Sequence, residues 1–202
     1  CLSATVPNVD ELADWIETVR GEPVTVVRME RRPVPLDHRV WVPDLGPVTI
    51  DDGLAVLRRP MKERRSMRRE RRPTRLLDWL QSQDLLPVLF FAFSRKDCEA
   101  LAVENARRTL LDMTRRREML TLFDDLVQRY ECRETETLAR LRTLAAGGVG
   151  YHHAGMLPVH KEIVERLFTS GLVRMLFATE TLALGVNMPA RTVAFSGLRK
   201  FD

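Results

Sequence analysis

Residues 87–99 read PVLFFAFSRKDCE, and this stretch decides the fold class. It begins with a continuous apolar run over 88–93, bounded by proline and serine, which is typical of a strand buried on both faces of a parallel sheet. Ser94, followed three residues later by Asp97, has the form of a helix N-cap. The chain is therefore expected to pass directly from a buried strand into a helix, as in α/β folds.

The same alternation continues toward the C-terminus. Residues 149–153 form a short strand pattern, Pro158 stands at a helix start, and 173–178 and 191–195 are further strand candidates. Residues 113–146 contain no strand pattern and are expected to form one or two helices. These patterns together predict an α/β protein with a parallel, doubly wound sheet and a helical insertion over 113–146.

The N-terminal part carries a second, shorter pattern. Residues 9–19 place their apolar side chains on one helical stripe, and Gly21 is positioned to end that helix. Residues 24–27 have the pattern of a buried strand. Four prolines interrupt the following stretch and leave only 38–42 as a strand candidate. A domain boundary is therefore expected near residues 30–35.

Composition bounds the class of protein. The 202 residues are 45% hydrophobic and 30% charged, which excludes collagen-like, disordered and disulfide-stapled chains. The longest apolar stretch, 85–93, contains a proline and is far shorter than the roughly 20 residues that cross a bilayer. The three cysteines are scattered, which favours a reducing compartment, and we expect a cytoplasmic location. The chain opens on Cys1 without a basic-then-apolar leader, so we interpret it as a piece of a longer protein.

Positive charge is concentrated in residues 58–75. This run holds ten Lys/Arg and two Glu, a local charge of +8 in a chain whose net charge is +4. Such a density can neutralise several phosphates of a nucleic acid. The alternative is a solvated helix or linker, and the run by itself leaves both interpretations open. The predicted basic patch comprises Arg64, Arg65, Arg68 and Arg69.

Polar residues stand at three predicted strand ends, where ligands of parallel sheets bind. These segments are Ser94-Arg95-Lys96, His152-His153-Ala154-Gly155 and Thr179-Glu180-Thr181. Each precedes a predicted helix whose first N–H groups could hold a phosphate, so they form a candidate anion-binding row. In the alternative interpretation, Ser94 only caps a helix and Thr179 only ends a strand. The recurrence of the pattern favours the anion-binding interpretation.

Other chemistry is disfavoured. His152 and His153 are adjacent in a strand and point to opposite faces, and no acidic or cysteine partner stands at ligand spacing, so no metal site is expected. Cys98 falls on an apolar helix face and is interpreted as structural. The sequence contains no GxxxxGK[ST] phosphate loop.

Four strings, in order, resemble motifs of the superkiller-type DExH-box RNA helicases of superfamily 2. LSATVPN (2–8) is similar to motif III, FAFSRKDCE (91–99) to motif IV, YHHAGMLPVHKEIVERLF (151–168) to the segment between motifs IV and V, and FATETLALGVNMPARTVAF (177–195) to motif V. The resemblance thus reaches from the first residues nearly to the last.

The resemblance implies a RecA-like fold of the P-loop NTPase type. In this family two RecA-like domains close on ATP in their cleft and on a nucleic-acid strand across their tops. Residues 1–32 would be the tail of the first domain, 33–86 a linker and basic helical segment, and 87–202 an incomplete second domain with the insertion 113–146. The Walker A loop, the DExH carboxylates and motif VI with its arginine finger are not found in this chain.

The resemblance also implies roles for single residues. Ser3 and Thr5 of motif III would couple nucleotide state to strand binding, and Gly185 and Asn187 would lie at the nucleotide cleft. Asn187 stands where relatives outside this branch often carry Asp. The residues implied to hold the nucleic-acid backbone are Ser94, Arg95, Gly155, Thr179 and Glu180. No catalytic residue is implied within this chain.

The function expected from these observations is the second motor domain of an ATP-dependent RNA helicase, inactive by itself. The alternatives are a DNA repair helicase of the same superfamily and a non-catalytic nucleic-acid-binding adaptor, because backbone contacts do not identify the sugar. ATP and Mg²⁺ would be cofactors of the parent protein, without tight binding to this piece. The expected partners are single-stranded RNA or DNA and the first RecA-like domain, with no membrane and with dimerisation through residues 1–30.

Overall fold

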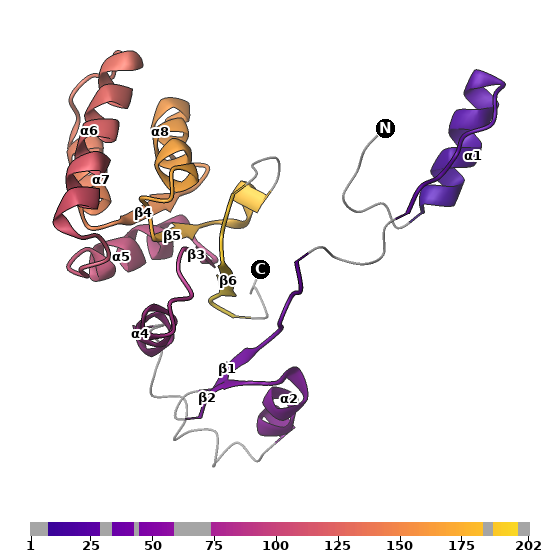
Figure 1. The fold of residues 1–202 in the computed structure, drawn as a ribbon, viewed down its shortest axis with the longest axis horizontal. Helices are drawn as coiled ribbons and strands as arrows, with labels where there is room; N and C mark the ends of the chain where they lie inside the picture. Colours follow the sequence, from indigo (N-terminus) through magenta and orange to yellow (C-terminus); the bar gives the residue numbers. More distant parts are fainter. Residues whose placement is uncertain (1–7, 29–33, 43–44, 59–73, 184–187, 198–202) are drawn as a thin grey trace. The chain divides into compact units, whose positions relative to one another are not determined.

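Four short strands form the central sheet of the computed structural model (Figure 1). The model describes residues 8–28, 34–42, 45–58, 74–183 and 188–197. The sheet strands are β3 (Val88–Phe91), β4 (Val149–His152), β5 (Met175–Ala178) and β6 (Thr192–Phe195). Their order is β4-β5-β3-β6 and every pair is parallel, so the predicted α/β class with a parallel sheet is confirmed.

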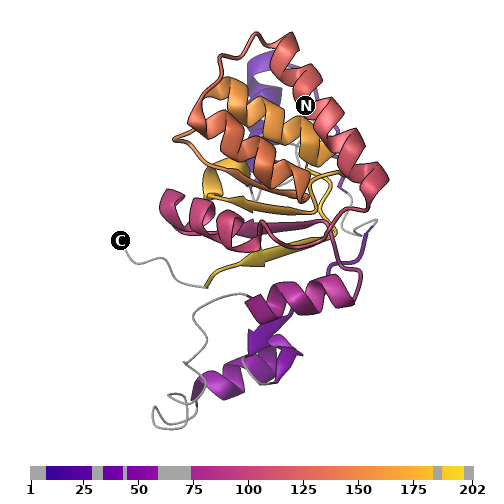
Figure 2. The ribbon, with the colours of Figure 1, turned by 90° about the vertical axis from the view of Figure 1, so that its left-hand side faces the viewer.

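Five described helices accompany this sheet. They are α4 (Thr74–Ser82), α5 (Arg95–Asn105), α6 (Met113–Arg129), α7 (Glu136–Ala146) and α8 (Pro158–Thr169). Figure 2 shows α6, α7 and α8 grouped on the β4 side of the sheet. The predicted insertion is therefore a pair of helices. They are joined by a two-pronged ion pair in which Arg142 donates to Asp124 over 2.8 and 2.7 Å.

The register of the strands assigns side chains to the two faces of the sheet. Tyr151 pairs with Phe177, and Phe177 pairs with Phe90, so these three rings share one face, with the Phe90 and Phe177 centroids 5.7 Å apart. Gly150 lies on the opposite face, where a Cβ would meet Val164 of α8 at 3.5 Å. On the Tyr151 face, Glu99 of α5 and Arg140 of α7 lie near Tyr151, so helices cover both faces, as the doubly wound pattern predicts.

Side-chain caps fix the starts of α5 and α7, and the cap at Ser94 was predicted from the sequence. The Ser94 hydroxyl accepts the Asp97 N–H at 3.0 Å, and the Thr135 hydroxyl accepts the Leu138 N–H at 3.1 Å. Each cap satisfies a helix N–H that has no partner within the helix. After α8 the chain turns at Gly171, whose φ of 77° lies in the left-handed region that glycine adopts without strain.

Residues 1–64 form a separate compact unit. Helix α1 (Val9–Arg20) is followed by Gly21 with φ 71°, as predicted. The strand predicted over 24–27 is wrong, because residues 23–28 adopt no regular secondary structure and Val27 is 88% exposed. A strand needs a neighbour for its backbone hydrogen bonds, and no described strand pairs with this segment; instead the Val24 N–H donates to Glu17 at 2.8 Å.

The same unit contains one predicted strand, and a second strand and a helix that the sequence analysis missed. Strand β1 (Val40–Val42), predicted within 38–42, pairs antiparallel with β2 (Gly46–Val48). Pro47 lies in β2, and a two-stranded hairpin tolerates it because an edge strand need not donate on its open side. Helix α2 (Ile50–Arg58) follows; its signal was the cap pair Thr49 and Asp52, whose hydroxyl-to-carboxylate distance is 2.7 Å. The predicted domain limits at 32/33 and 86/87 stay predictions.

Candidate nucleic-acid interface at the carboxyl edge of the sheet

The loops that follow β3, β4 and β5 begin side by side. The Ala92 N–H after β3 donates to the Ala178 carbonyl at 2.8 Å, and the Thr179 N–H after β5 donates to the His152 carbonyl at 3.2 Å. The strands are parallel neighbours, so their carboxyl ends meet at one edge. The three polar segments predicted to form one row thus emerge from one edge.

Arg95, the first residue of α5, and Gly155, in the turn after β4, lie in contact. A Cβ added to Gly155 would lie 3.1 Å from the Arg95 Nη1 and 3.2 Å from its Cδ. Glycine therefore leaves the space that the Arg95 side chain occupies. Both residues are exposed to solvent, so this pair presents a guanidinium beside an open backbone turn. The guanidinium is a donor that suits a phosphate, whereas the Gly155 N–H already donates to Nδ1 of His153 at 3.1 Å.

Ser94 caps the start of α5, which is the structural role given above as the alternative to phosphate binding. Its hydroxyl donates to the Asp97 carboxylate at 2.7 Å while accepting the Asp97 N–H. The hydrogen of the hydroxyl would have to turn away from Asp97 to donate to a phosphate. Ser94 is exposed at the row, so the binding role stays a prediction beside the observed cap.

Thr179 and Glu180 occupy the end of β5. Thr179 is half-buried and its carbonyl accepts the Leu182 N–H at 3.1 Å, which starts the short 3₁₀ helix Glu180–Ala183. Glu180 is exposed at the start of this turn. The carboxylate places negative charge at the same edge as Arg95, so a phosphate bound there would need the arginine to offset that charge. The binding roles of Thr179 and Glu180 stay predictions.

The adjacent histidines point to opposite faces, as the sequence indicated. His152 contacts Glu165 of α8, with 2.7 Å between Nε2 and Oε1. Burial lowers the pKa of His152, although the Glu165 carboxylate acts in the other direction. Among the described residues its Nδ1 has no hydrogen-bond partner.

His153 contacts a different set of groups. Its Nε2 lies 3.0 Å from Oε1 of Glu99 in α5, and its Nδ1 accepts the Gly155 N–H at 3.1 Å. Sequence reasoning missed this arrangement. The short spacing from His153 to Gly155 was a local signal for the second contact, whereas nothing in the sequence pairs His153 with a helix residue 54 positions away.

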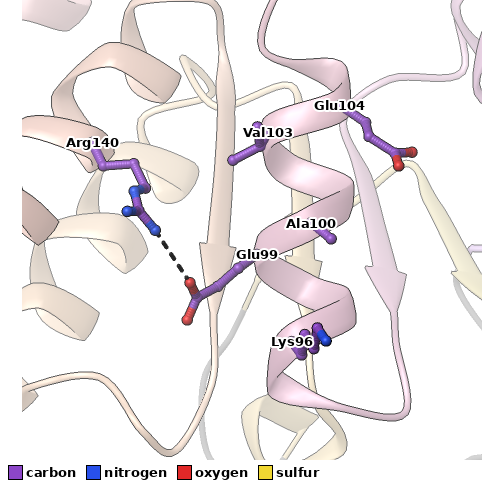
Figure 3. Close-up of a pocket in the computed structure, with 6 residues that line it drawn as sticks. All are labelled: Lys96, Glu99, Ala100, Val103, Glu104 and Arg140. Atoms are coloured by element: carbon purple, nitrogen blue, oxygen red, sulfur yellow. Dashed lines mark ion pairs between the residues drawn. The ribbon is translucent and has the colours of Figure 1, made fainter.

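A pocket of about 630 Å³ lies beside this site, between α5 and α7. Figure 3 shows Glu99 of α5 and Arg140 of α7 facing each other, with 3.5 Å between Oε2 and Nη1. Its lining residues are Lys96, Glu99, Ala100, Val103, Glu104 and Arg140. The pocket lining mixes both signs of charge, so it carries no preference for an anion.

Metal-ligand clusters and the buried thiol of Cys98 concern the described part of the chain. No group of three His, Cys, Asp or Glu side chains within the described ranges could hold a metal ion. Cys98 is fully buried, and burial raises the pKa of its thiol to about 12, which suppresses the reactive thiolate. Among the described helices, none is long and apolar enough to span a bilayer.

Several predicted positions lie outside the described residues. They are the motif III residues Ser3 and Thr5, the basic patch Arg64, Arg65, Arg68 and Arg69, and the nucleotide-cleft residues Gly185 and Asn187.

The parallel sheet with polar carboxyl-edge loops is consistent with a truncated RecA-like fold. No protein-family model matches the sequence. Similar proteins include the ATP-dependent RNA helicase mtr4 of Schizosaccharomyces pombe (31% identity), the superkiller complex protein 2 of Mus musculus (36%) and the probable helicase HelY of Mycobacterium tuberculosis (39%). Each alignment covers 100% of this chain but only 21%, 19% and 26% of the respective relative.

The chain is therefore homologous, over its whole length, to a segment of the Mtr4/Ski2-type DExH-box RNA helicases of superfamily 2. This confirms the resemblance predicted from its motifs. The chain spans about a fifth to a quarter of the length of these relatives.

Proposed function

We propose that this chain contributes the second motor domain of an ATP-dependent RNA helicase and holds the backbone of a single RNA strand at the carboxyl edge of its sheet. The observation that carries the proposal is the contact between Arg95 and Gly155 across two strand ends. The proposed backbone contacts are Ser94, Arg95, Gly155, Thr179 and Glu180. The names of the relatives support RNA as the substrate and ATP, with Mg²⁺, as the cofactor.

In this proposal the 202 residues do not hydrolyse ATP by themselves. Phosphoryl transfer needs a phosphate cradle, metal-binding carboxylates and an arginine finger together. The sequence has no GxxxxGK[ST] loop, which is the usual phosphate cradle. RNA-stimulated ATP turnover by the purified chain would contradict the proposal.

The test of the proposal is binding of a labelled oligouridine across a KCl series. Arg95→Gln should weaken binding and reduce the slope of log affinity against log salt by about 0.7, the value for one phosphate contact on a single strand. Arg115→Gln is the matched control. It removes the same charge from α6, beside Arg174, which precedes β5 and so lies at the opposite edge of the sheet.

An Arg95→Gln slope equal to that of the parent chain would refute the proposed site. Oligodeoxythymidine, measured in the same series, separates RNA from the DNA alternative. Equal affinity for oligouridine and oligodeoxythymidine would indicate a site that binds the phosphate backbone without contacting the 2′-OH.

The proposal extends to partners of the N-terminal segment. Leu12, Trp15 and Val19 form an exposed apolar stripe on α1, and Trp15 is 63% exposed. Such a stripe needs a covering surface. We expect the first RecA-like domain of the parent to cover it, and the isolated chain to dimerise through residues 1–30. Sedimentation at several concentrations tests this, and a cytoplasmic location stays a prediction.

A further inference from the structure

Glu99 joins three elements that are distant in sequence. Its Oε1 lies 3.0 Å from Nε2 of His153, which follows β4, and its Oε2 lies 3.5 Å from Nη1 of Arg140 in α7 (Figure 3). His153 is buried, with only 5% of its side chain exposed, whereas Glu99 is 37% exposed. The carboxylate therefore connects a surface helix to a ring held inside the fold.

The hydrogen bonds of His153 define its tautomer. A backbone N–H only donates, so the Nδ1 that lies 3.1 Å from the Gly155 nitrogen must accept and carries no hydrogen. The neutral ring then carries its hydrogen on Nε2 and donates it to Glu99. A carboxylate at Nε2 thus fixes the tautomer that the Gly155 turn requires.

The His153 ring is also held by stacking on Tyr151. Tyr151 and His153 stack with centroids 5.5 Å apart and planes 15° apart. Stacking, the Glu99 contact and the Gly155 contact together leave the imidazole one orientation. In that orientation Nδ1 lies 3.2 Å from where a Gly155 Cβ would stand, on the residue against which Arg95 packs.

We propose that Glu99 and His153 are a positioning pair for the Arg95–Gly155 phosphate contact, and that Arg140 links this pair to the α6–α7 helices. The inference rests on the proposed function, because it assigns these residues a part in backbone binding. In this proposal Glu99, His153 and Arg140 do not contact the RNA strand. They hold the turn at Gly155, against which Arg95 lies. The Arg140–Glu99 ion pair would then link α7 to the site beside the direct packing of α7 on β4.

The first measurement needs no RNA. His153→Phe keeps a ring of similar size on Tyr151 but loses both nitrogen contacts, and His152→Phe is the matched control on the opposite face. Amide hydrogen exchange of Gly155, followed by NMR on the 202-residue chain, should accelerate about fivefold in His153→Phe, as loss of one hydrogen bond allows. His152→Phe should leave it unchanged. An unchanged Gly155 exchange rate in His153→Phe would overturn the inference.

Glu99→Ala provides the second variant if His153→Phe does not fold. It keeps the imidazole but removes the group that fixes its tautomer, so Gly155 exchange should again accelerate. Arg140→Gln should accelerate it less, and Arg142→Gln, on the same helix but paired with Asp124, not at all. Equal effects of Arg140→Gln and Arg142→Gln would refute the link to α7.

The RNA measurement separates the two proposals. If Arg95→Gln lowers oligouridine affinity and His153→Phe lowers it too, the double variant should be no weaker than Arg95→Gln, because both changes remove one contact. If the affinity losses of Arg95→Gln and His153→Phe multiply in the double variant, the positioning role is overturned, while the proposed function stays intact. If Arg95→Gln has no effect, the proposed function fails, whereas the exchange data still decide whether Glu99 and His153 hold the turn.

Discussion

His152 and His153 are consecutive residues that each contact a glutamate, but the two pairs lie in different surroundings. The His152–Glu165 pair joins β4 to α8 and leaves one ring nitrogen without a partner among the described residues. The His153–Glu99 pair uses both ring nitrogens and ends at a glycine of the carboxyl-edge loop. Alternation along the strand assigns one histidine to the core and the other to the candidate site.

The largest expected effect comes from removing the partner of the core histidine. Glu165→Ala leaves both nitrogens of His152 unpartnered beneath α8, which should lower the free energy of unfolding by about 1–3 kcal/mol. Glu99→Ala should cost less, because Glu99 is 37% exposed and water can replace it at the His153 ring, whereas Glu165 is 22% exposed. Urea unfolding of both variants measures the difference, and equal losses would contradict this distinction between the pairs.

The next effect concerns the two glycines that flank the histidines. Gly155→Ala adds a Cβ that meets Arg95 and His153 at 3.1–3.2 Å, so it should displace Arg95 and weaken oligouridine binding by about tenfold, as loss of a charge-assisted hydrogen bond would. Gly150→Ala is the control on the His152 face. Its Cβ meets Leu176 and Val164 at ordinary contact distances of 3.4 and 3.5 Å, so binding should not change. Similar binding by the two variants would refute the role of Gly155.

A pH dependence of stability should arise on the His152 side. Burial lowers the pKa of His152 below its ordinary 6.5, so near that pH the unfolded chain binds more protons than the folded one. Stability is then complete above about pH 6.5 and falls as the pH drops below it, by at most about 1.4 kcal/mol per pH unit for one proton. Burial shifts the pKa of His160 in the same direction.

Urea unfolding from pH 7.5 to 5 checks this dependence, with the pH range chosen to bracket about 6.5, the ordinary histidine value. His152→Phe should flatten the curve, and His160→Phe should flatten it independently. A His152→Phe curve as steep as that of the parent would show that His152 is not the titrating group.

The smallest effect is expected at the exposed ion pair between α6 and α7. Arg142 and Asp124 are 47% and 53% exposed, so Arg142→Gln should cost about 0.2–1 kcal/mol despite the two-pronged geometry. The same variant should leave oligouridine binding unchanged. A change in oligouridine binding would show that any disturbance of α7 reaches the site. It would contradict the specific role of Arg140 in linking α7 to Glu99.

Local patterns predicted most of the elements around the sheet. The apolar run at 88–93, the cap formed by Ser94 and the helix start at Pro158 each reflect backbone preferences within a few residues, and each prediction is confirmed. The strand predicted at 24–27 failed because an apolar run becomes a strand only beside a partner. Helix α2 was missed although Thr49 and Asp52 carried the cap signal that identified α5.

The sequence by itself determined the fold class, the relation to the helicases and the edge of the sheet where polar residues gather. Periodicity and strand alternation depend on nearby residues, and parallel strands must end at a common edge. Only the tertiary structure placed Arg95 against Gly155 and Glu99 between His153 and Arg140. These contacts join residues 41 to 60 positions apart, and they exist because the helical crossovers bring α5, α7 and the end of β4 together.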